Sequence, residues 1–275
     1  MRIGLIGCGR VGVTIFYLLK KHNTIVGVYD TDDKKERKAV KVLGIRNNSN
    51  YSEMIIRSDA LFIATPDDTV LEAYKKMYRY LKETKLVFHF SGILPAKILS
   101  KKRNVFRASI HPFATFPEIM IPPARKHLFM SVEGDREAMM GARAIFHPEY
   151  FTLKRLKKED KVFYHLIGVF SSNLLVGLVA SIYDIVQKIN WKEKDIDQLV
   201  YPIIEETLRN IKKHGLRKSL SGPLQRGDVE TIKKHLKTLR QHKQLLRIYK
   251  ELSLYIVQNL TPGSKKRRLR KLLSE

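Results

Sequence analysis

The first residues whose types and spacing suggest chemistry form a glycine-rich motif near the amino terminus. It consists of Gly7, Cys8, Gly9, Arg10, Val11 and Gly12, directly after a short apolar run and directly before an amphipathic pattern. In such a motif the first glycine permits a tight turn, the second lets a pyrophosphate approach the main chain, and the third lets helix and strand pack closely. The helix start adds free N–H groups and a partial positive charge. We therefore predict that these six residues bind the diphosphate of a dinucleotide.

Asp30 ends the next apolar run, at the distance from the glycine motif where a carboxylate accepts hydrogen bonds from the adenosine ribose. A carboxylate there would repel a 2′-phosphate, which favours NAD over NADP. Lys34 and Lys35 follow closely and could accept that phosphate, so NADP stays open. In the alternative interpretation the glycines only form a tight turn and Asp30 is an ordinary strand-end residue.

Polar residues also follow three later apolar runs. Thr65 and Pro66 lie where the nicotinamide-side ribose would pass, and Ser91 could donate a hydrogen bond to substrate or nicotinamide. His111 titrates near neutrality and could orient or exchange the proton that accompanies hydride transfer. We predict Ser91 and His111 as catalytic residues, against the alternatives of a turn hydroxyl and a structural histidine.

The second half of the chain offers a polar stripe on one long helical pattern. Lys161, His165 and Asn173 follow near-helical spacing, and we predict His165 and Asn173 as further catalytic residues facing a cleft between two domains. An unpaired Asn173 in so apolar a segment would cost about 1 to 3 kcal/mol, so it needs a ligand or an interhelical partner. Arg226 could hold an anionic substrate group, or simply pair with Asp228.

The elements that must position these residues change character near residue 154. Before it, short apolar runs alternate with helical patterns, which predicts an α/β fold, a Rossmann-type doubly wound parallel sheet. After it, apolar residues recur at helical spacing, which predicts an all-α C-terminal domain. The expected strands cover residues 3–6, 24–29, 60–65, 86–90, 105–110, 129–133 and 151–153, and the expected helices cover 11–21, 163–188, 192–213 and 229–259. We predict a dinucleotide-binding domain over 1–154, a helical substrate and dimerisation domain over 155–263, and a basic tail over 264–275.

Composition narrows the function further. With 275 residues and 44% hydrophobic content the chain is neither a disulfide-stapled miniprotein nor a disordered one. Its single cysteine fits a reducing compartment, so the cytoplasm is the expected location. A net charge of +25 would attract anions, which favours a small anionic substrate and leaves nucleic acid as a weaker alternative, because no nucleic-acid motif accompanies the basic tail. No metal site is predicted.

One uncharged stretch, residues 166–183, approaches the length of a membrane span. Ser171, Ser172 and Asn173 interrupt it, and its flanks carry no topology signal. We therefore expect a helix buried in a core or a subunit interface, and no membrane partner.

Several short motifs in one order resemble the Rossmann-like proteins whose C-terminal half is known as domain of unknown function 2520. After the glycine motif come residues 89–92, 109–112, 132–135, 164–165 with 171–173, and 221–223 with 226–228. The resemblance implies an oxidoreductase, grouped with pyrroline-carboxylate reductase, β-hydroxyacid dehydrogenases and NADP-deazaflavin oxidoreductases, whose helical domain often builds a homodimer. That family is usually described as NADP-binding, whereas Asp30 favours NAD.

Ser91 and the pair His111-Pro112 are also similar to a local pattern of prephenate dehydrogenases, in which the equivalent residues contact the substrate. The rest of that family's substrate pattern is not visible. The leading hypothesis is an NAD(P)-dependent oxidoreductase acting on a small anionic substrate. The alternative is a non-catalytic Rossmann protein that senses dinucleotides or associates with nucleic acid.

Overall fold

The computed structural model describes residues 1–46, 50–119 and 127–274. Two compact units divide the chain, Met1–Leu175 and Val176–Glu275. The division lies later than the predicted boundary at residue 154, because the first helix after that boundary packs against the sheet through Lys161, whose Nζ donates to Ser109 Oγ at 2.7 Å. The change from alternating strands and helices to helices alone thus comes before the end of the first compact unit.

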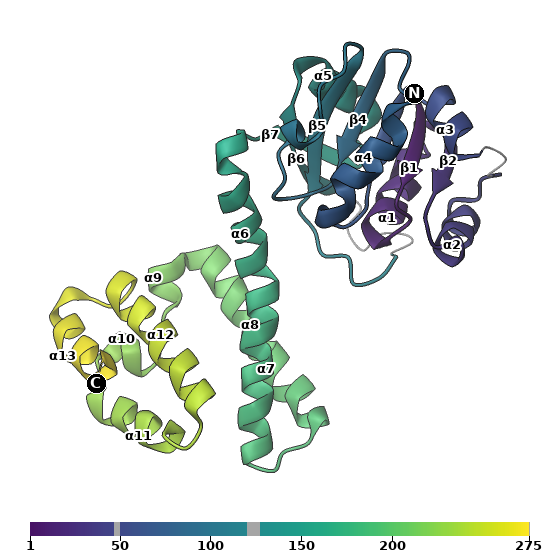
Figure 1. The fold of residues 1–275 in the computed structure, drawn as a ribbon. Coiled ribbons are helices and arrows are strands. Elements are labelled where there is room, and N and C mark those ends of the chain that lie inside the picture. The colour runs from purple at the N-terminus through teal and green to yellow at the C-terminus, as the bar shows by residue number, and fades with distance from the viewer. Residues whose placement is uncertain (47–49, 120–126, 275) are drawn as a thin grey trace. The chain divides into compact units, whose positions relative to one another are not determined.

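The first unit is built on one seven-stranded sheet in the order β2-β1-β3-β4-β5-β6-β7 (Figure 1). The strands are β1 Arg2–Ile6, β2 Thr24–Tyr29, β3 Ala60–Ile63, β4 Lys85–His89, β5 Val105–Pro112, β6 Leu128–Gly134 and β7 Phe151–Arg155. Strands β1 to β5 pair in parallel, as predicted. Strand β6 pairs antiparallel with β5, and β7 is parallel to β6. The predicted Rossmann-type sheet is confirmed, with two reversed strands at one edge.

Helices cover both faces of this sheet, as a doubly wound fold requires. One face packs against α1 Arg10–Leu19, α2 Asp33–Leu43 and α5 Arg136–Ile145, and the other against α3 Tyr51–Arg57 and α4 Val70–Tyr78. Successive strand residues serve opposite faces, since Phe62 of β3 belongs to the first core and Leu61 to the second. Strand β3 is apolar throughout because both of its faces are buried. Single 3-10 turns lie at Asp67–Thr69, Ala96–Ile98 and Lys158–Asp160.

The second half is helical, as predicted. Its helices are α6 Lys161–Ser171, α7 Asn173–Lys188, α8 Glu193–His214, α9 Leu216–Ser219, α10 Pro223–Arg226, α11 Val229–Leu239, α12 Lys243–Asn259 and α13 Gly263–Ser274. The expected helix over 192–213 is confirmed as α8, with each end shifted by one residue, whereas the other two expected helices are interrupted. The expected helix over 163–188 is interrupted at Ser172, which adopts φ −131° and ψ −73°. The expected helix over 229–259 is two helices, of which α11 begins at the predicted cap Asp228, whose side chain accepts from Thr231 N. A continuous apolar stripe therefore did not mean a continuous helix.

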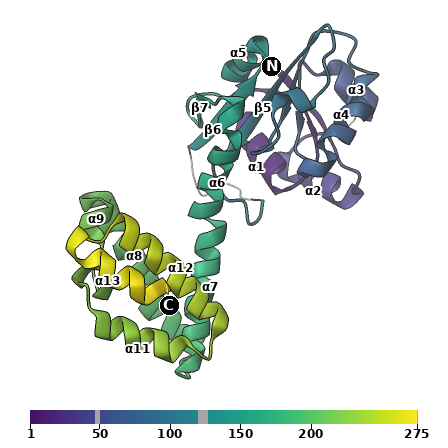
Figure 2. The same cartoon turned by 60° about the vertical axis from the view of Figure 1, so that its left-hand side comes forward.

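The prediction of a basic tail over residues 264–275 is wrong, because most of that segment is the packed helix α13. Leu269 and Leu273 are fully buried against Ile232 of α11 and Val257 of α12. Figure 2 shows α11, α12 and α13 side by side. The cationic side chains occupy the other face of α13, so burial of one leucine stripe outweighs the repulsion between charges that remain in solvent.

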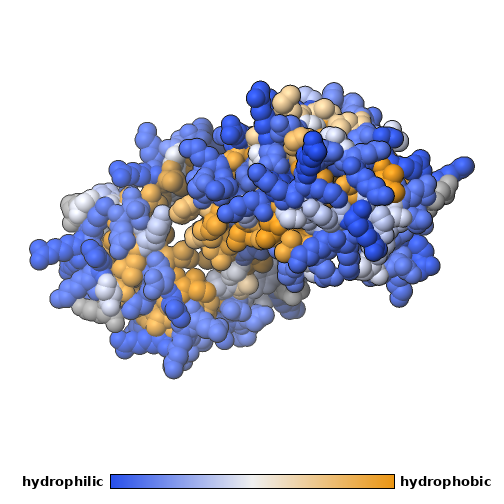
Figure 3. Space-filling view, turned by 45° about the horizontal axis from the view of Figure 1, so that its top comes forward, coloured by the Kyte–Doolittle hydropathy of each residue, from blue (hydrophilic) through white to orange (hydrophobic). Residues whose placement is uncertain are grey.

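The apolar stretch after residue 158 is largely unburied within its own chain. Residues 158–188 form helical structure long and apolar enough to span a membrane, and only 6% of the most apolar window is buried. Phe163, Phe170 and Val176 are 73%, 67% and 68% exposed, and areas of exposed apolar side chains are visible in Figure 3. The expectation of a helix buried in the chain's own core is therefore wrong. Burial against another subunit stays a prediction.

Candidate functional site

The glycine motif forms the turn between β1 and α1 with two crowded positions and one open position. Gly7 has φ +92°, and a Cβ there would lie 2.7 Å from the carbonyl carbon of Ala64. A Cβ at Gly12 would lie 2.8 Å from Ala64 Cβ. At Gly9 the nearest atom would be the carbonyl oxygen of Ala64 at 3.9 Å, an ordinary contact. Packing thus explains the first and third glycines, whereas the absence of a side chain at Gly9 keeps space open outside the main chain.

The start of α1 has the features of an anion site. Gly9 is its N-cap, no side-chain cap is found among the described residues, and its first turn contains no acidic residue. The first N–H groups of a helix have no partner inside it, so here they are available to a bound anion. Arg10 begins the helix and donates to the carbonyl oxygen of Pro117 at 2.8 Å.

Asp30 supports the turn from the end of β2. Its Oδ2 accepts from the N–H of Cys8 at 2.7 Å, and its Oδ1 accepts from the N–H of Asp32 at 2.9 Å. Cys8 is buried, and this burial raises the pKa of its thiol to about 12. The thiol is therefore neutral, and Cys8 contributes shape and a backbone bond rather than a nucleophile.

A cleft of about 790 Å³ runs along this turn. Seven of the nine predicted cofactor residues line it, namely Gly7, Gly9, Arg10, Val11, Asp30, Thr65 and Pro66. The other two, Cys8 and Gly12, lie buried beneath the turn. The cleft continues past residues that sequence reasoning missed, among them Tyr51, whose ring lies 4.4 Å from that of Tyr29 between centroids. Tyr51 has no motif signal, since it belongs to a helix whose position beside β2 only the fold reveals.

The strand order places the polar strand ends in one row. Along the sequence β2-β1-β3-β4-β5 the carboxyl ends carry Asp30, the glycine motif, Thr65, Ser91 and His111. Because these five strands are parallel, the ends share one edge of the sheet, the edge where open α/β sheets bind ligands. The row leads from the cofactor cleft toward His111.

His111 has a defined tautomer, and the described residues offer no hydrogen-bond partner to its second ring nitrogen. Its Nδ1 lies 2.9 Å from the carbonyl oxygen of Phe90, and since a carbonyl only accepts, Nδ1 carries the proton and Nε2 keeps a lone pair. Burial lowers the pKa of His111, and the positive charge of Lys161 adds to the effect. His111 is consequently a neutral imidazole at pH 7, able to accept a proton through Nε2.

Two predicted histidines meet above Gly92. A Cβ added to Gly92 would lie 2.7 Å from His165 Nδ1 and 3.0 Å from His111 Nε2. The ring centroids of His111 and His165 are 6.1 Å apart, and Tyr164 lies edge-on to His111 at 6.0 Å. The structure thus brings together His111 on β5 and His165 on α6 across the turn after β4.

Two other predicted catalytic residues, Ser91 and Asn173, do not join the group around His111. Ser91 is buried, and its Oγ accepts from the N–H groups of Ile93 and Leu94 at 3.2 and 2.9 Å, which is the turn role that the sequence left open. Asn173 begins α7 in an exposed position, and no described hydrogen bond connects it to the histidines. The structure therefore does not bring Asn173 into the group around His111.

In the loop before α11, the structure shows the pairing of Arg226 with Asp228, the simpler of the two interpretations that the sequence left open. Arg226 lies 3.9 Å from Asp228, whose carboxylate caps that helix. The pairing that the sequence left open for these two residues is therefore present.

Behind His111 lies a buried charged pair that sequence reasoning only half recognised. Lys161 Nζ donates to Ser109 Oγ at 2.7 Å and lies 4.0 Å from Glu133 Oε2. Glu133 also accepts from the N–H of Ala96 at 3.0 Å. Burial lowers the pKa of Lys161 and raises that of Glu133. The sequence analysis singled out Lys161 in the polar stripe. It did not predict that Lys161 pairs with Glu133, because the residue pattern of β6 does not show which side chain lies near a distant helix.

Two family models cover most of the chain. Residues 1–88 match an oxidoreductase family with an NAD-binding Rossmann fold, and residues 128–256 match a domain of unknown function, DUF2520. One model therefore matches the Rossmann part of the chain, and the other matches much of its second half. These matches confirm the resemblance found in the motifs.

Solved structures agree on the fold over nearly the whole chain. A Bacteroides fragilis protein provisionally named an NADP oxidoreductase has a TM-score of 0.72 at 21% identity, covering 93% of this chain and 97% of that one. A Thermotoga maritima protein has a TM-score of 0.67 at 20% identity, covering 99% and 100%. Pyrroline carboxylate reductase of Plasmodium falciparum, solved with NADP bound, has a TM-score of 0.61 at 13% identity, covering 99% and 98%. No curated protein matches the chain.

Proposed function

We propose that this protein is an NAD(P)-dependent oxidoreductase that transfers a hydride between the nicotinamide cofactor and a small anionic substrate. One observation carries the proposal, namely that an open main-chain turn at Gly9 and a neutral His111 with a free Nε2 lie along one sheet edge. A protein that only binds dinucleotides requires the turn at Gly9, but it does not require a base such as His111 held in one tautomer.

The residues of the cleft fit the cofactor. Gly9 leaves room beside unpaired helix N–H groups, where a diphosphate would lie, and Asp30 stands at the strand end where the adenosine ribose would lie. Thr65 and Pro66 line the continuation of the cleft toward the nicotinamide end. When bound, the cofactor supplies hydride transfer, and the protein supplies position and proton exchange.

His111 would handle the proton. In the oxidative direction its Nε2 takes the hydroxyl proton as the substrate carbon gives up a hydride, and in the reductive direction the same nitrogen returns it. The lowered pKa keeps Nε2 unprotonated to a lower pH than in an ordinary histidine, so the base stays competent over a wider range on the acidic side. The net charge of +25 favours an anionic substrate.

Asp30 favours NAD as the cofactor. Both of its oxygens already accept backbone N–H bonds, so the carboxylate is held at the cleft and a 2′-phosphate would meet a fixed negative charge. Three cations, Arg10, Lys35 and Lys76, line the same cleft. Lys35 lies 3.9 Å from Asp32, which offsets part of its charge.

We further propose that the protein forms a homodimer through α6 and α7. Their exposed apolar side chains form a surface that another copy of the same helices would bury, and such a self-complementary contact is the commonest form of assembly. The apolar surface is the support for this assignment.

The redox assignment is tested by turnover. Hydroxy acids, oxo acids and imino acids would be screened with NAD, NADP, NADH and NADPH, and the active pair repeated with His111→Asn. Asparagine keeps a donor for the Phe90 carbonyl but lacks Nε2, so we expect a loss of kcat of about 10² to 10⁴. His214→Asn, at the exposed end of α8, is the matched control. Full activity in His111→Asn would remove His111 from the mechanism.

A second candidate function is polyanion binding at α13. A groove of about 580 Å³ is lined by Lys266, Arg267, Arg270 and Lys271, with no acidic residue among its described lining. Phosphate backbones bind such cation rows through counterion release. Salt-dependent binding of single-stranded DNA that weakens in Arg267→Gln/Arg270→Gln would support it, and no binding at low salt would dismiss it.

A further inference from the structure

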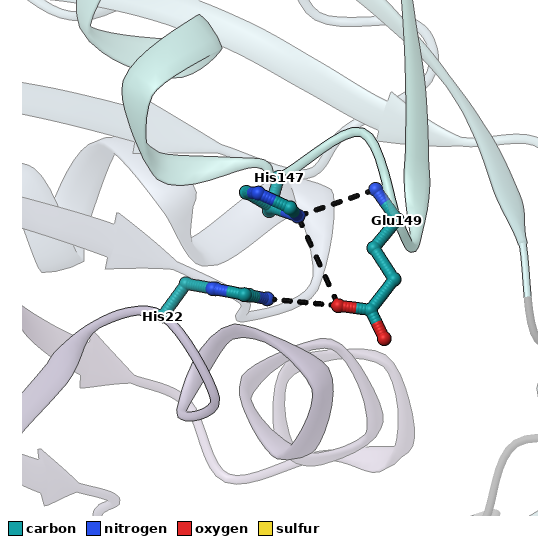
Figure 4. A group of neighbouring side chains, drawn as sticks. All are labelled: His22, His147 and Glu149. Carbon is teal, nitrogen blue, oxygen red and sulfur yellow. Dashed lines mark hydrogen bonds and ion pairs between the residues drawn. The ribbon is translucent and has the colours of Figure 1, made fainter.

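We propose a transition-metal site, suited to Zn²⁺, formed by His22, His147 and Glu149. His22 follows α1, and the other two residues lie between α5 and β7 (Figure 4). Two imidazoles and one carboxylate are a ligand set that Zn²⁺ uses in proteins, with the remaining position taken by water. The site lies beyond the carboxyl end of α1, whereas the cofactor cleft lies at its amino end, so it is independent of the proposed function.

The three ligand atoms are close to the spacing that one ion requires. Glu149 Oε2 lies 3.1 Å from His22 Nε2 and 3.9 Å from His147 Nδ1, and all three atoms lie within 4.8 Å of one another. Ligands at about 2.0 to 2.1 Å from a tetrahedral ion are separated by about 3.3 Å. The two measured distances bracket this value, so small side-chain rotations would bring the atoms onto one ion.

The two imidazoles are held close together. Their rings stack with centroids 3.8 Å apart and planes 16° from parallel, so one ring must turn for both in-plane lone pairs to reach one ion. Figure 4 shows both rings next to the same carboxylate. The backbone between them is tied as well, because Asn23 Nδ2 donates to the carbonyls of Leu19 at 2.9 Å and Ile145 at 3.0 Å, which joins the ends of α1 and α5.

Hydrogen bonds hold the carboxylate next to the histidines. His147 Nδ1 accepts a 3.3 Å hydrogen bond from the N–H of Glu149, so its lone pair faces that N–H and an ion would replace this bond. Glu149 Oε1 accepts from the hydroxyl of Tyr150, which leaves Oε2 for the ion.

Without an ion, the same residues form an exposed His–Glu contact, in which solvent screens any charge interaction. The metal would clamp the turn after α1 to the segment before β7.

The test is calorimetric titration of ZnCl₂ into the full-length, EDTA-treated and dialysed protein, together with thermal unfolding with and without ZnCl₂. We expect one site, and a rise in the melting temperature with Zn²⁺ because the ion binds only the folded state. His22→Ala and His147→Ala should each weaken Zn²⁺ binding at least tenfold and abolish the rise. The control His214→Ala changes an exposed histidine at the end of α8 and should behave as wild type.

A second measurement keeps the proposal falsifiable if an alanine variant folds poorly. Co²⁺ bound by the wild type should give the visible absorption of a four-coordinate ion, and His147→Gln should lose it. Binding of Zn²⁺ that survives in His22→Ala and His147→Ala, or is lost only in His111→Ala, would overturn the proposal. Weak binding at several sites without a change in melting temperature would overturn it too.

Discussion

At the scale of single residues, the candidate site depends on two glycines as much as on its histidines. Gly9 faces open space, so the lack of a side chain there leaves room for a bound ligand rather than for another part of the chain. Gly92 faces His111 and His165, so its small size sets where the two imidazoles can lie. In the proposed function, Gly9 would therefore control cofactor access and Gly92 the geometry of proton exchange.

Gly92→Ala should separate these two roles. The added methyl group would overlap His165 Nδ1 and His111 Nε2, and the imidazoles must move to relieve it. Because a displacement of about 1 Å in a reacting group costs on the order of 10² in rate, kcat should fall by that factor while cofactor affinity stays within about twofold. Steady-state kinetics and cofactor titration of the same preparation measure both. Unchanged kcat would show that the rings do not act on substrate.

At the residue scale the sequence predicted the cofactor side better than the catalytic side. The glycine motif and Asp30 are defined by local spacing, and five of these seven residues line one cleft. His111 and His165 were singled out separately, and only the fold shows that they meet above Gly92. Asn173 was chosen because it interrupts an apolar run, yet exposure satisfies its amide without a ligand.

At the scale of elements, the join between α6 and the sheet is a buried charged pair. Lys161 is 2% exposed, and its partners Ser109 and Glu133 belong to β5 and β6. This pair fixes the start of α6, and with it the position of His165 one turn later.

Lys161→Met should destabilise the fold by about 3 to 5 kcal/mol, because it leaves Glu133 buried without its cation. Lys161→Met/Glu133→Gln should recover much of that loss, since glutamine keeps an oxygen for the Ala96 N–H and carries no charge. Urea unfolding of both variants measures the difference. Equal stabilities of the single and double variants would show that the charges do not interact.

Strand positions were predictable because a buried parallel strand is an uninterrupted apolar run, and β2 was predicted with its observed ends. In the second half the ends of α8 were predictable to within one residue, but the breaks inside the two longer apolar patterns were not. The apolar stripe continues through the chain reversal between α11 and α12, where neither glycine nor proline marks the break. We predicted a tail over 264–275 because the segment is rich in basic residues. The burial of Leu269 and Leu273 depends on helices that lie earlier in the chain, so the local sequence did not predict it.

At the scale of the whole molecule, the exposed apolar surface of α6 and α7 is the feature that its own chain does not explain. Soluble monomers rarely expose large apolar patches, so a partner surface is expected there. A second copy of the chain would supply an equally apolar partner surface through its own α6 and α7.

Phe170→Glu should therefore shift the assembly from dimer to monomer, because it would place a charge in an apolar contact. Light scattering after gel filtration gives the mass directly. Tyr255→Glu, at a similarly exposed aromatic residue on α12, should leave the mass unchanged. A wild-type monomer, or a Phe170→Glu variant that stays dimeric, would contradict the proposed interface.

The central claim is that the turn at Gly9 holds the diphosphate of a nicotinamide dinucleotide. Calorimetric titration of NADH and NADPH into the wild type, Gly9→Ala and the control Gly263→Ala tests it most directly. The added methyl at either position meets no close atom of the chain, so both variants should fold as the wild type does. We predict that the wild type and Gly263→Ala bind, with NADH tighter, and that Gly9→Ala loses at least tenfold in affinity. Binding of neither dinucleotide by the wild type, or equal binding by Gly9→Ala, would contradict the account.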